Sequence, residues 1–128
     1  MQQIYNWMFW FLLVIACIIF VVLFFIDAPY GRFYRNGWGR ALSGRVAWIL
    51  MEAPAALTIL VMALLSPRLT ALPALVFLLI WESHYFYRAF IFPFRGSGKR
   101  RPVPITIVCM GAIFNIWNGF LNGPDFFI

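Results

Sequence analysis

Three ionisable side chains interrupt a long apolar stretch of this sequence. Glu82, His84 and Arg88 lie within residues 69–94, which otherwise have the composition of a membrane-spanning helix. A charged side chain near the middle of a bilayer costs roughly 2.5–3.5 kcal/mol on insertion scales, so such residues usually face protein, water or a ligand. A further carboxylate, Glu52, lies in the preceding apolar run. The sequence therefore predicts one buried polar site shared by two helices.

Glu52 and Tyr85 have a chemistry that they could share. A phenol in a dry pocket can donate a proton or a hydrogen bond to a carbonyl oxygen on which negative charge develops, and a nearby carboxylate can orient the phenol. Two structural alternatives stay open. Glu52 could form an ion pair that holds helices together, with Arg88 as the partner. Tyr85 could be an ordinary buried phenol that has found a hydrogen-bond partner. Glu82 has no assigned role.

The composition is that of a membrane protein. Of 128 residues, 64% are hydrophobic and 11% are charged, and the net charge is +6. Soluble domains are nearer 45–50% apolar and about 25% charged. The basic residues lie in short loops between apolar runs, which argues against nucleic-acid binding. A single histidine, and two cysteines without a C-x-x-C pair, give no metal-site spacing. Cys17 and Cys109 are expected to be buried thiols.

The apolar runs predict an all-α, polytopic bundle that forms a single transmembrane domain over residues 1–128. Its helices are expected at about 7–26, 46–65, 69–94 and 103–122. The first run has no charge and is long enough for a ~30 Å hydrocarbon core. It lacks the positive start and the cleavage site of a signal peptide, so we expect it to be retained. Pro54 predicts a kink beside Glu52, and residues 122–125 predict a turn.

The distribution of basic residues predicts how the helices are oriented. They concentrate in the first and third loops, as Arg32, Arg35, Arg40 and Arg45, and as Arg95, Lys99, Arg100 and Arg101. The positive-inside rule places both loops in the cytoplasm and the N-terminus outside, in a bacterial inner membrane or an endoplasmic reticulum. At ~1.5 Å per residue, Glu52 and Tyr85 then lie about 10 and 15 Å from the cytoplasmic side. The third loop lacks the G-x-x-x-x-G-K-[ST] pattern of a phosphate-binding loop.

Several stretches resemble motifs of the steroid 5α-reductases (3-oxo-5α-steroid 4-dehydrogenases), in the same order along the chain. Residues 47–54 resemble the family's A-W-x-x-x-E-x-P. Residues 83–94 and the basic loop after them resemble H-Y-x-x-R…Y-P-F…R-G-x-x-P. Residues 118–122 are similar to N-G-x-L-Q, and residues 30–32 to a weaker Y-G-R. The matches extend from about residue 30 to 123, and they are specific as a set although each is weak alone.

The resemblance implies a membrane reductase that uses NADPH to saturate the 4,5 double bond of a 3-oxo-4-ene steroid. It implies that Glu52 and Tyr85 polarise the 3-keto group while hydride passes to C5 and a proton to C4. The further roles that it implies are a substrate pocket lined by Trp48 and Phe114, and cofactor contacts from Arg88, Arg101 and Asn118. The implied partners are a steroid or other lipid enone and membrane lipid, without metal or nucleic acid.

Two departures from the family affect these expectations. The basic loop is about two residues longer than in the family, and the family has about seven helices where this sequence predicts four. We therefore expect this polypeptide by itself to bind NADPH incompletely and to have little or no activity. Two alternatives stay open: a related membrane enoyl-CoA or polyprenol reductase, which shares the H-Y-x-x-R helix, and a non-catalytic four-helix membrane subunit.

Overall fold

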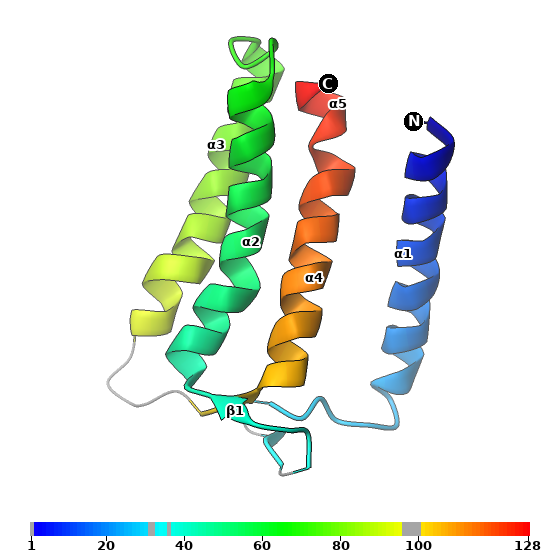
Figure 1. Cartoon of the computed structure of the whole chain (residues 1–128), viewed down its shortest axis with the longest axis vertical. Helices are drawn as coiled ribbons and strands as arrows, with labels where there is room; N and C mark the ends of the chain where they lie inside the picture. The colour runs from blue at the N-terminus through cyan, green and yellow to red at the C-terminus, as the bar shows by residue number, and fades with distance from the viewer. Residues whose placement is uncertain (1, 31–32, 36, 96–100) are drawn as a thin grey trace.

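The computed structural model describes residues 2–30, 33–35, 37–95 and 101–128, and its long helices form a bundle (Figure 1). The helices are α1 (Gln2–Val22), α2 (Gly44–Leu65), α3 (Leu72–Phe86), α4 (Ile105–Asn122) and the short α5 (Pro124–Phe127). A π-helical segment, η2 (Tyr87–Ile91), and a 3-10 turn, η3 (Phe92–Phe94), continue α3. Within the described residues, 4 helical spans are long and apolar enough to cross a membrane. This confirms the predicted all-α membrane bundle.

The helix ends differ from the predicted ranges for local reasons. The first helix begins at Gln2, earlier than expected, because polar residues near the N-terminus are compatible with a helix, and it ends at Val22. The third begins at Leu72, with a proline in its first turn, where the missing N–H costs nothing. The predicted turn at residues 122–125 is wrong. Gly123 keeps helical angles (φ −66°, ψ −41°), so the chain only bends before α5 begins at Pro124.

A short antiparallel strand pair closes one end of the bundle. β1 (Ala41–Leu42) pairs with β2 (Val103–Pro104), so residues 103 and 104 precede α4 instead of beginning it. Beside this pair, the Ile105 N–H donates to the Arg40 carbonyl at 2.8 Å. The first and third loops therefore meet at the end of the bundle opposite the two chain termini (Figure 1). Strands of two residues carry no periodicity, and so the sequence did not reveal them.

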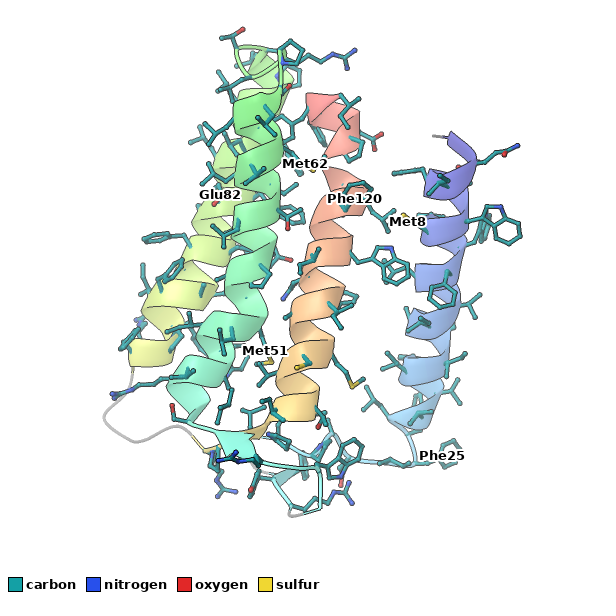
Figure 2. All side chains as sticks on the ribbon, in the orientation of Figure 1. Met8, Phe25, Met51, Met62, Glu82 and Phe120 are labelled. Carbon is teal, nitrogen blue, oxygen red and sulfur yellow. The ribbon has the colours of Figure 1, made fainter. Side chains whose placement is uncertain are left out.

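α2 and α4 pack closely because small residues on α4 face α2. A Cβ atom at Gly111 would lie 3.0 Å from the Met51 Cγ, and one at Gly119 would lie 3.0 Å from the Thr58 Cβ. Met51 lies between the two helices in Figure 2. In lipid, where apolar surface gains nothing from leaving water, close backbone approach of this kind drives helix association.

Two apolar clusters fill the bundle near its two ends. The cluster next to the strands is built from Ala47, Met51, Val103 and Val108. The cluster next to the termini is built from Ile59, Ala63, Ala74 and Phe127. It is extended by Phe77 and Phe126, whose rings stack with centroids 4.1 Å apart. The Ser66 hydroxyl also donates to the Phe127 carbonyl at 2.6 Å, which ties the end of α2 to α5.

α1 lies beside α4 and presents most of its surface outward (Figure 1). The Tyr5 hydroxyl donates to the Leu121 carbonyl at 3.0 Å, and the Phe11 and Trp117 rings stack with centroids 5.3 Å apart. The expectation of buried thiols is wrong. Cys17 on α1 and Cys109 on α4 are both exposed, on surfaces that would face lipid in a membrane-spanning bundle.

The glycines of α4 give a matched test of this packing. We expect Gly119→Ala to destabilise the fold by about 1–3 kcal/mol, because the Thr58 Cβ is fixed to the backbone of α2 and cannot move aside. Gly111→Ala should cost less, since the Met51 side chain that it meets is flexible. Thermal unfolding in detergent, followed by tryptophan fluorescence, measures both. Equal losses in the two variants would contradict this account of the α2–α4 contact.

Candidate functional site

A layer of polar side chains lies between the two apolar clusters. Its centre is an ion pair between α2 and η2, in which Arg88 Nη2 lies 2.5 Å from Glu52 Oε1. Glu52 is only 7% exposed. The Arg88 guanidinium carbon also lies 5.1 Å from the centroid of the Trp48 ring, within range of a cation–π contact. The charge of the carboxylate and the charge of the guanidinium thus compensate each other inside an apolar bundle.

Pro93 explains the local geometry that carries Arg88. A proline inside a helix has no N–H to donate, and its ring clashes with the carbonyl four residues earlier, here that of Ala89. The helix widens before it, and the Phe92 N–H donates to the Tyr87 carbonyl five residues back. Such π-turns insert an extra residue per turn and are frequent at functional sites. Arg88 lies in the widened turn, next to the fully buried Ala89.

Tyr85 is held at the same level of the bundle by α4. The Asn118 Nδ2 donates to the Tyr85 hydroxyl oxygen at 3.2 Å. The Tyr85 ring lies against the Trp81 ring, with centroids 4.8 Å apart. Trp81 is itself fixed, because its Nε1 donates to the Ala55 carbonyl of α2 at 3.1 Å. Tyr85 lies three residues before Arg88 along the same continuous helical segment, and this spacing places the phenol and the ion pair on one side of it.

Backbone carbonyls of α2 near Glu52 accept hydrogen bonds from side chains. Asn115 Nδ2 donates to the Met51 carbonyl at 2.6 Å, and the Thr58 hydroxyl donates to the Pro54 carbonyl at 2.7 Å. α2 continues as a helix through Pro54. A carbonyl has two lone pairs, so it can accept from a side chain in addition to the helix. These bonds anchor the backbone that carries Glu52.

The structure brings most of the predicted site residues together but pairs them differently. Arg88 contacts both Glu52 and Trp48, and Asn118 binds Tyr85, which lies three residues before Arg88. The sequence predicts that Glu52 orients Tyr85. In the structure Glu52 is bound by Arg88 and Tyr85 by Asn118, and no hydrogen bond joins the carboxylate to the phenol among the described residues.

Three predicted or conspicuous residues lie outside this set. Phe114 is 48% exposed, one turn before Asn118 on α4. Arg101 is exposed, two residues before β2 begins. The rest of the predicted basic loop, residues 96–100, and Arg32 lie outside the described residues. Glu82, labelled in Figure 2, is half-buried, and its Oε1 has no hydrogen-bond partner among the described residues.

Sequence reasoning missed the contributions of Trp81 and of two asparagines, Asn115 and Asn122. Asn115, Asn118 and Asn122 recur at helical spacing, a signal that places neighbouring amides on one side of α4. In the sequence, Trp81 shares a helical face with Tyr85 and Arg88, but the spacing does not reveal the carbonyl that its Nε1 binds. Within the described residues, no group of His, Cys, Asp and Glu gathers that could hold a metal ion.

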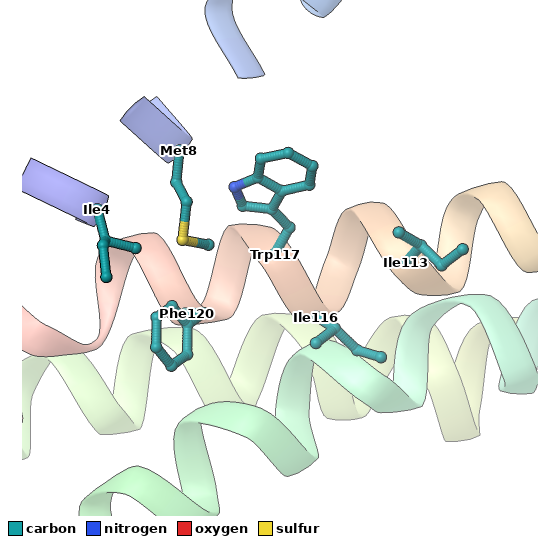
Figure 3. Close-up of a pocket in the computed structure, with 6 residues that line it drawn as sticks. All are labelled: Ile4, Met8, Ile113, Ile116, Trp117 and Phe120. Atoms are coloured by element: carbon teal, nitrogen blue, oxygen red, sulfur yellow. The ribbon is translucent and has the colours of Figure 1, made fainter. Parts of the chain in front are cut away.

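A hollow lies elsewhere, between α1 and α4 (Figure 3). It measures about 570 Å³ and is lined by Ile4, Met8, Ile113, Ile116, Trp117 and Phe120. None of the polar-layer residues lines it, so its size says nothing about their chemistry. The chemistry lies in the polar layer, where a phenol with its oxygen already accepting one hydrogen bond stands beside a compensated carboxylate. Such a group can donate its hydrogen to a carbonyl oxygen.

Comparison with known proteins gives consistent relatives. The chain is 37% identical to steroid 5-alpha-reductase DET2 of Arabidopsis thaliana over 108 residues, which cover 80% of this chain and 41% of the relative. It is 33% identical to the protein of the same name from Gossypium hirsutum over 94% of this chain and 48% of the relative. It is 32% identical to 3-oxo-5-alpha-steroid 4-dehydrogenase 1 of Bos taurus over 84% of this chain and 43% of the relative. The chain thus spans slightly less than half the length of these curated relatives. No family model matches the sequence.

The two ends of the ion pair differ in exposure, which predicts unequal effects of removing them. Arg88→Met leaves a carboxylate whose side chain is 9% exposed, and we expect a loss of about 3 kcal/mol in unfolding free energy. Glu52→Leu leaves a guanidinium that is 38% exposed and can extend toward water, so the loss should be about 1 kcal/mol.

The double variant separates this account from simple loss of packing. Once both charges are gone, the buried carboxylate no longer carries a penalty, so Glu52→Leu with Arg88→Met should be more stable than Arg88→Met alone. Unfolding in a detergent series measures all three variants. Additive losses would show that the two charges do not compensate each other.

Proposed function

Because this chain belongs to the steroid 5α-reductase family, we propose that it forms the carbonyl-polarising part of a membrane reductase that saturates the 4,5 double bond of 3-oxo-4-ene steroids. The observation that carries the proposal is the Tyr85 hydroxyl, which accepts a hydrogen bond from Asn118 beside the Glu52–Arg88 pair. NADPH, the cofactor that the family resemblance implies, would supply the hydride.

In this proposal Tyr85 is the acid of the site. When hydride reaches C5 of the enone, negative charge moves to the 3-oxo oxygen, and a hydrogen bond donated by Tyr85 stabilises that charge. C4 then takes up a proton. Apolar clusters lie on both sides of the polar layer, and a hydrogen bond in such low-dielectric surroundings is stronger than one in water.

Glu52 is proposed to act together with Arg88. Paired in this way, the carboxylate contributes a fixed charge next to Tyr85 and orients the guanidinium over Trp48. Trp48 and Phe92, whose ring centroids lie 5.2 Å apart, offer an apolar wall beside these charges. Phe114, one turn before Asn118, is proposed to extend the wall on α4.

The cofactor contacts that the resemblance implies for Arg88, Arg101 and Asn118 stay a prediction. Arg88 is engaged by Glu52, and Asn118 by Tyr85. Arg101 is exposed at the end of the bundle. The proposed function therefore rests on the carbonyl-polarising residues and not on these cofactor contacts.

A structural function is the second candidate, and the ion pair favours it. A short Arg–Glu contact between α2 and η2 would by itself hold the two helices in register in a non-catalytic membrane subunit. The two functions differ in what the Tyr85 hydroxyl is needed for, and the following experiment separates them.

We expect Tyr85→Phe to lose at least about 100-fold in turnover of a 4-ene-3-oxo steroid with NADPH, the scale of a lost acid group. The assay uses the gene product at its full natural length in detergent, with an enoyl-CoA and a polyprenol as competing substrates. Tyr87→Phe is the matched control, since Tyr87 is exposed on the same helix and binds Arg95. Glu52→Gln should also lose most of the turnover. Wild-type rates in both Tyr85→Phe and Glu52→Gln would rule out the acid site.

The strand pair generates a prediction about topology. Because β1 and β2 bring the first and third loops together, we propose that both face the cytoplasm, as their positive charge indicates. In intact cells, with Cys17 and Cys109 replaced by serine, a cysteine at exposed Thr70 should react with an impermeant maleimide. A cysteine at position 98 should react only after the cells are opened. Labelling of position 98 from outside would reverse this orientation.

A further inference from the structure

Asn122, the last residue of α4, donates to Asn118 twice. Its Nδ2 lies 2.8 Å from the Asn118 carbonyl oxygen and 3.1 Å from the Asn118 Oδ1. Asn118 in turn donates from its Nδ2 to the Tyr85 hydroxyl oxygen. The three side chains therefore form a chain of hydrogen bonds that begins at the end of α4 and ends at the phenol.

The backbone carbonyl of Asn118 fixes the direction of this chain. A carbonyl only accepts, so the atom of Asn122 that faces it must be the amide nitrogen. The same NH₂ group reaches the Asn118 side chain, which must therefore present its Oδ1 there. That leaves the Asn118 Nδ2 for Tyr85. The Tyr85 oxygen is thus an acceptor, and its own hydrogen is left for a different partner.

We propose that Asn122 is a positioning residue for Tyr85. It holds the Asn118 amide in the orientation that keeps the Tyr85 hydroxyl hydrogen available for a substrate carbonyl oxygen, and this rests on the function proposed above. Without Asn122 the Asn118 amide can turn over and present Oδ1 to the phenol. Tyr85 would then donate its hydrogen to Asn118 and would have to break that bond before it could donate to a substrate.

The direction of the Tyr85 hydrogen bond can be measured without turnover. In ultraviolet resonance Raman spectra, the intensity ratio of the tyrosine Fermi doublet is high when the phenol oxygen accepts and low when the hydroxyl donates. The chain is studied in detergent. For each protein, the spectrum of the same protein carrying an added Tyr85→Phe change is subtracted, so that the difference contains the signal of Tyr85. We expect a high ratio in the unmodified chain and a low ratio in Asn122→Leu.

Two further variants control for side effects. Asn122→Gln keeps an amide donor, and glutamine is the residue of the family motif N-G-x-L-Q at this place, so it should restore the high ratio. Asn6→Leu is the same asparagine-to-leucine substitution at an exposed position on α1, and it should leave the ratio high. An unchanged ratio in Asn122→Leu would overturn the proposal. So would a low ratio in Asn122→Gln, because that would trace the effect to a disturbed helix end.

Asn122→Asp covers the case in which Asn122→Leu does not fold. It has nearly the same shape, but an exposed, ionised carboxylate cannot donate to the Asn118 side chain. The Asn118 Nδ2 would then turn toward the carboxylate and its Oδ1 toward Tyr85. A low ratio supports the proposal and a high ratio overturns it.

Turnover by the gene product at its full natural length separates this proposal from the proposed function. Asn122→Leu should lower kcat about tenfold, a fraction of a full acid contribution, with KM changed less than about twofold. Asn122→Gln should recover most of kcat. If the intensity ratio falls in Asn122→Leu but neither the unmodified protein nor any variant turns over the steroid, the proposed function is wrong and the effect of Asn122 on Tyr85 still holds. Turnover with no Raman shift in Asn122→Leu would remove only the positioning role.

Discussion

The fold depends on compensating one negative charge inside an apolar bundle. An unpaired carboxylate at the position of Glu52 would cost several kcal/mol, which is a large fraction of the stability of a small protein. Arg88 removes that cost from the neighbouring helix, so α2 and η2 are held in one register along their axes. Trp81 donates to the carbonyl of Ala55, which lies about one turn after Glu52 on α2, and this bond supports the same register.

The apolar runs and their flanking charges were enough to predict the fold class. The helices of the bundle can be predicted from the length and composition of the apolar runs, because in lipid every backbone N–H and C=O must form its hydrogen bond within the segment. The strand pair and the helical path of the chain from α4 through Gly123 into α5 were not predictable in this way. Both depend on contacts between residues far apart in sequence, such as Ala41 with Pro104, and local periodicity carries no information about such contacts.

Several residues of the candidate site were predictable from the sequence, but the partner that each of them binds was not. Spacing places Glu52 and Tyr85 on inward faces at similar depth, and depth does not tell which groups meet. That choice depends on the widened turn that Pro93 imposes on Arg88, and on α4, which brings Asn118 between Tyr85 and Asn122. The ion pair that sequence reasoning kept as an alternative is present, and its presence is compatible with an acid role for Tyr85.

α4 links the helix packing to the candidate site, because different faces of α4 contact α2, Tyr85 and α1. Gly111 and Gly119 face α2 at close range, Asn118 faces Tyr85 of α3, and Trp117 faces α1. A hydrogen bond of 3.2 Å tolerates little displacement before it is lost. Any change that moves α4 away from α2 must therefore also move Asn118 relative to Tyr85. Close packing at the glycines is thus a condition for the geometry of the phenol, although no glycine touches it.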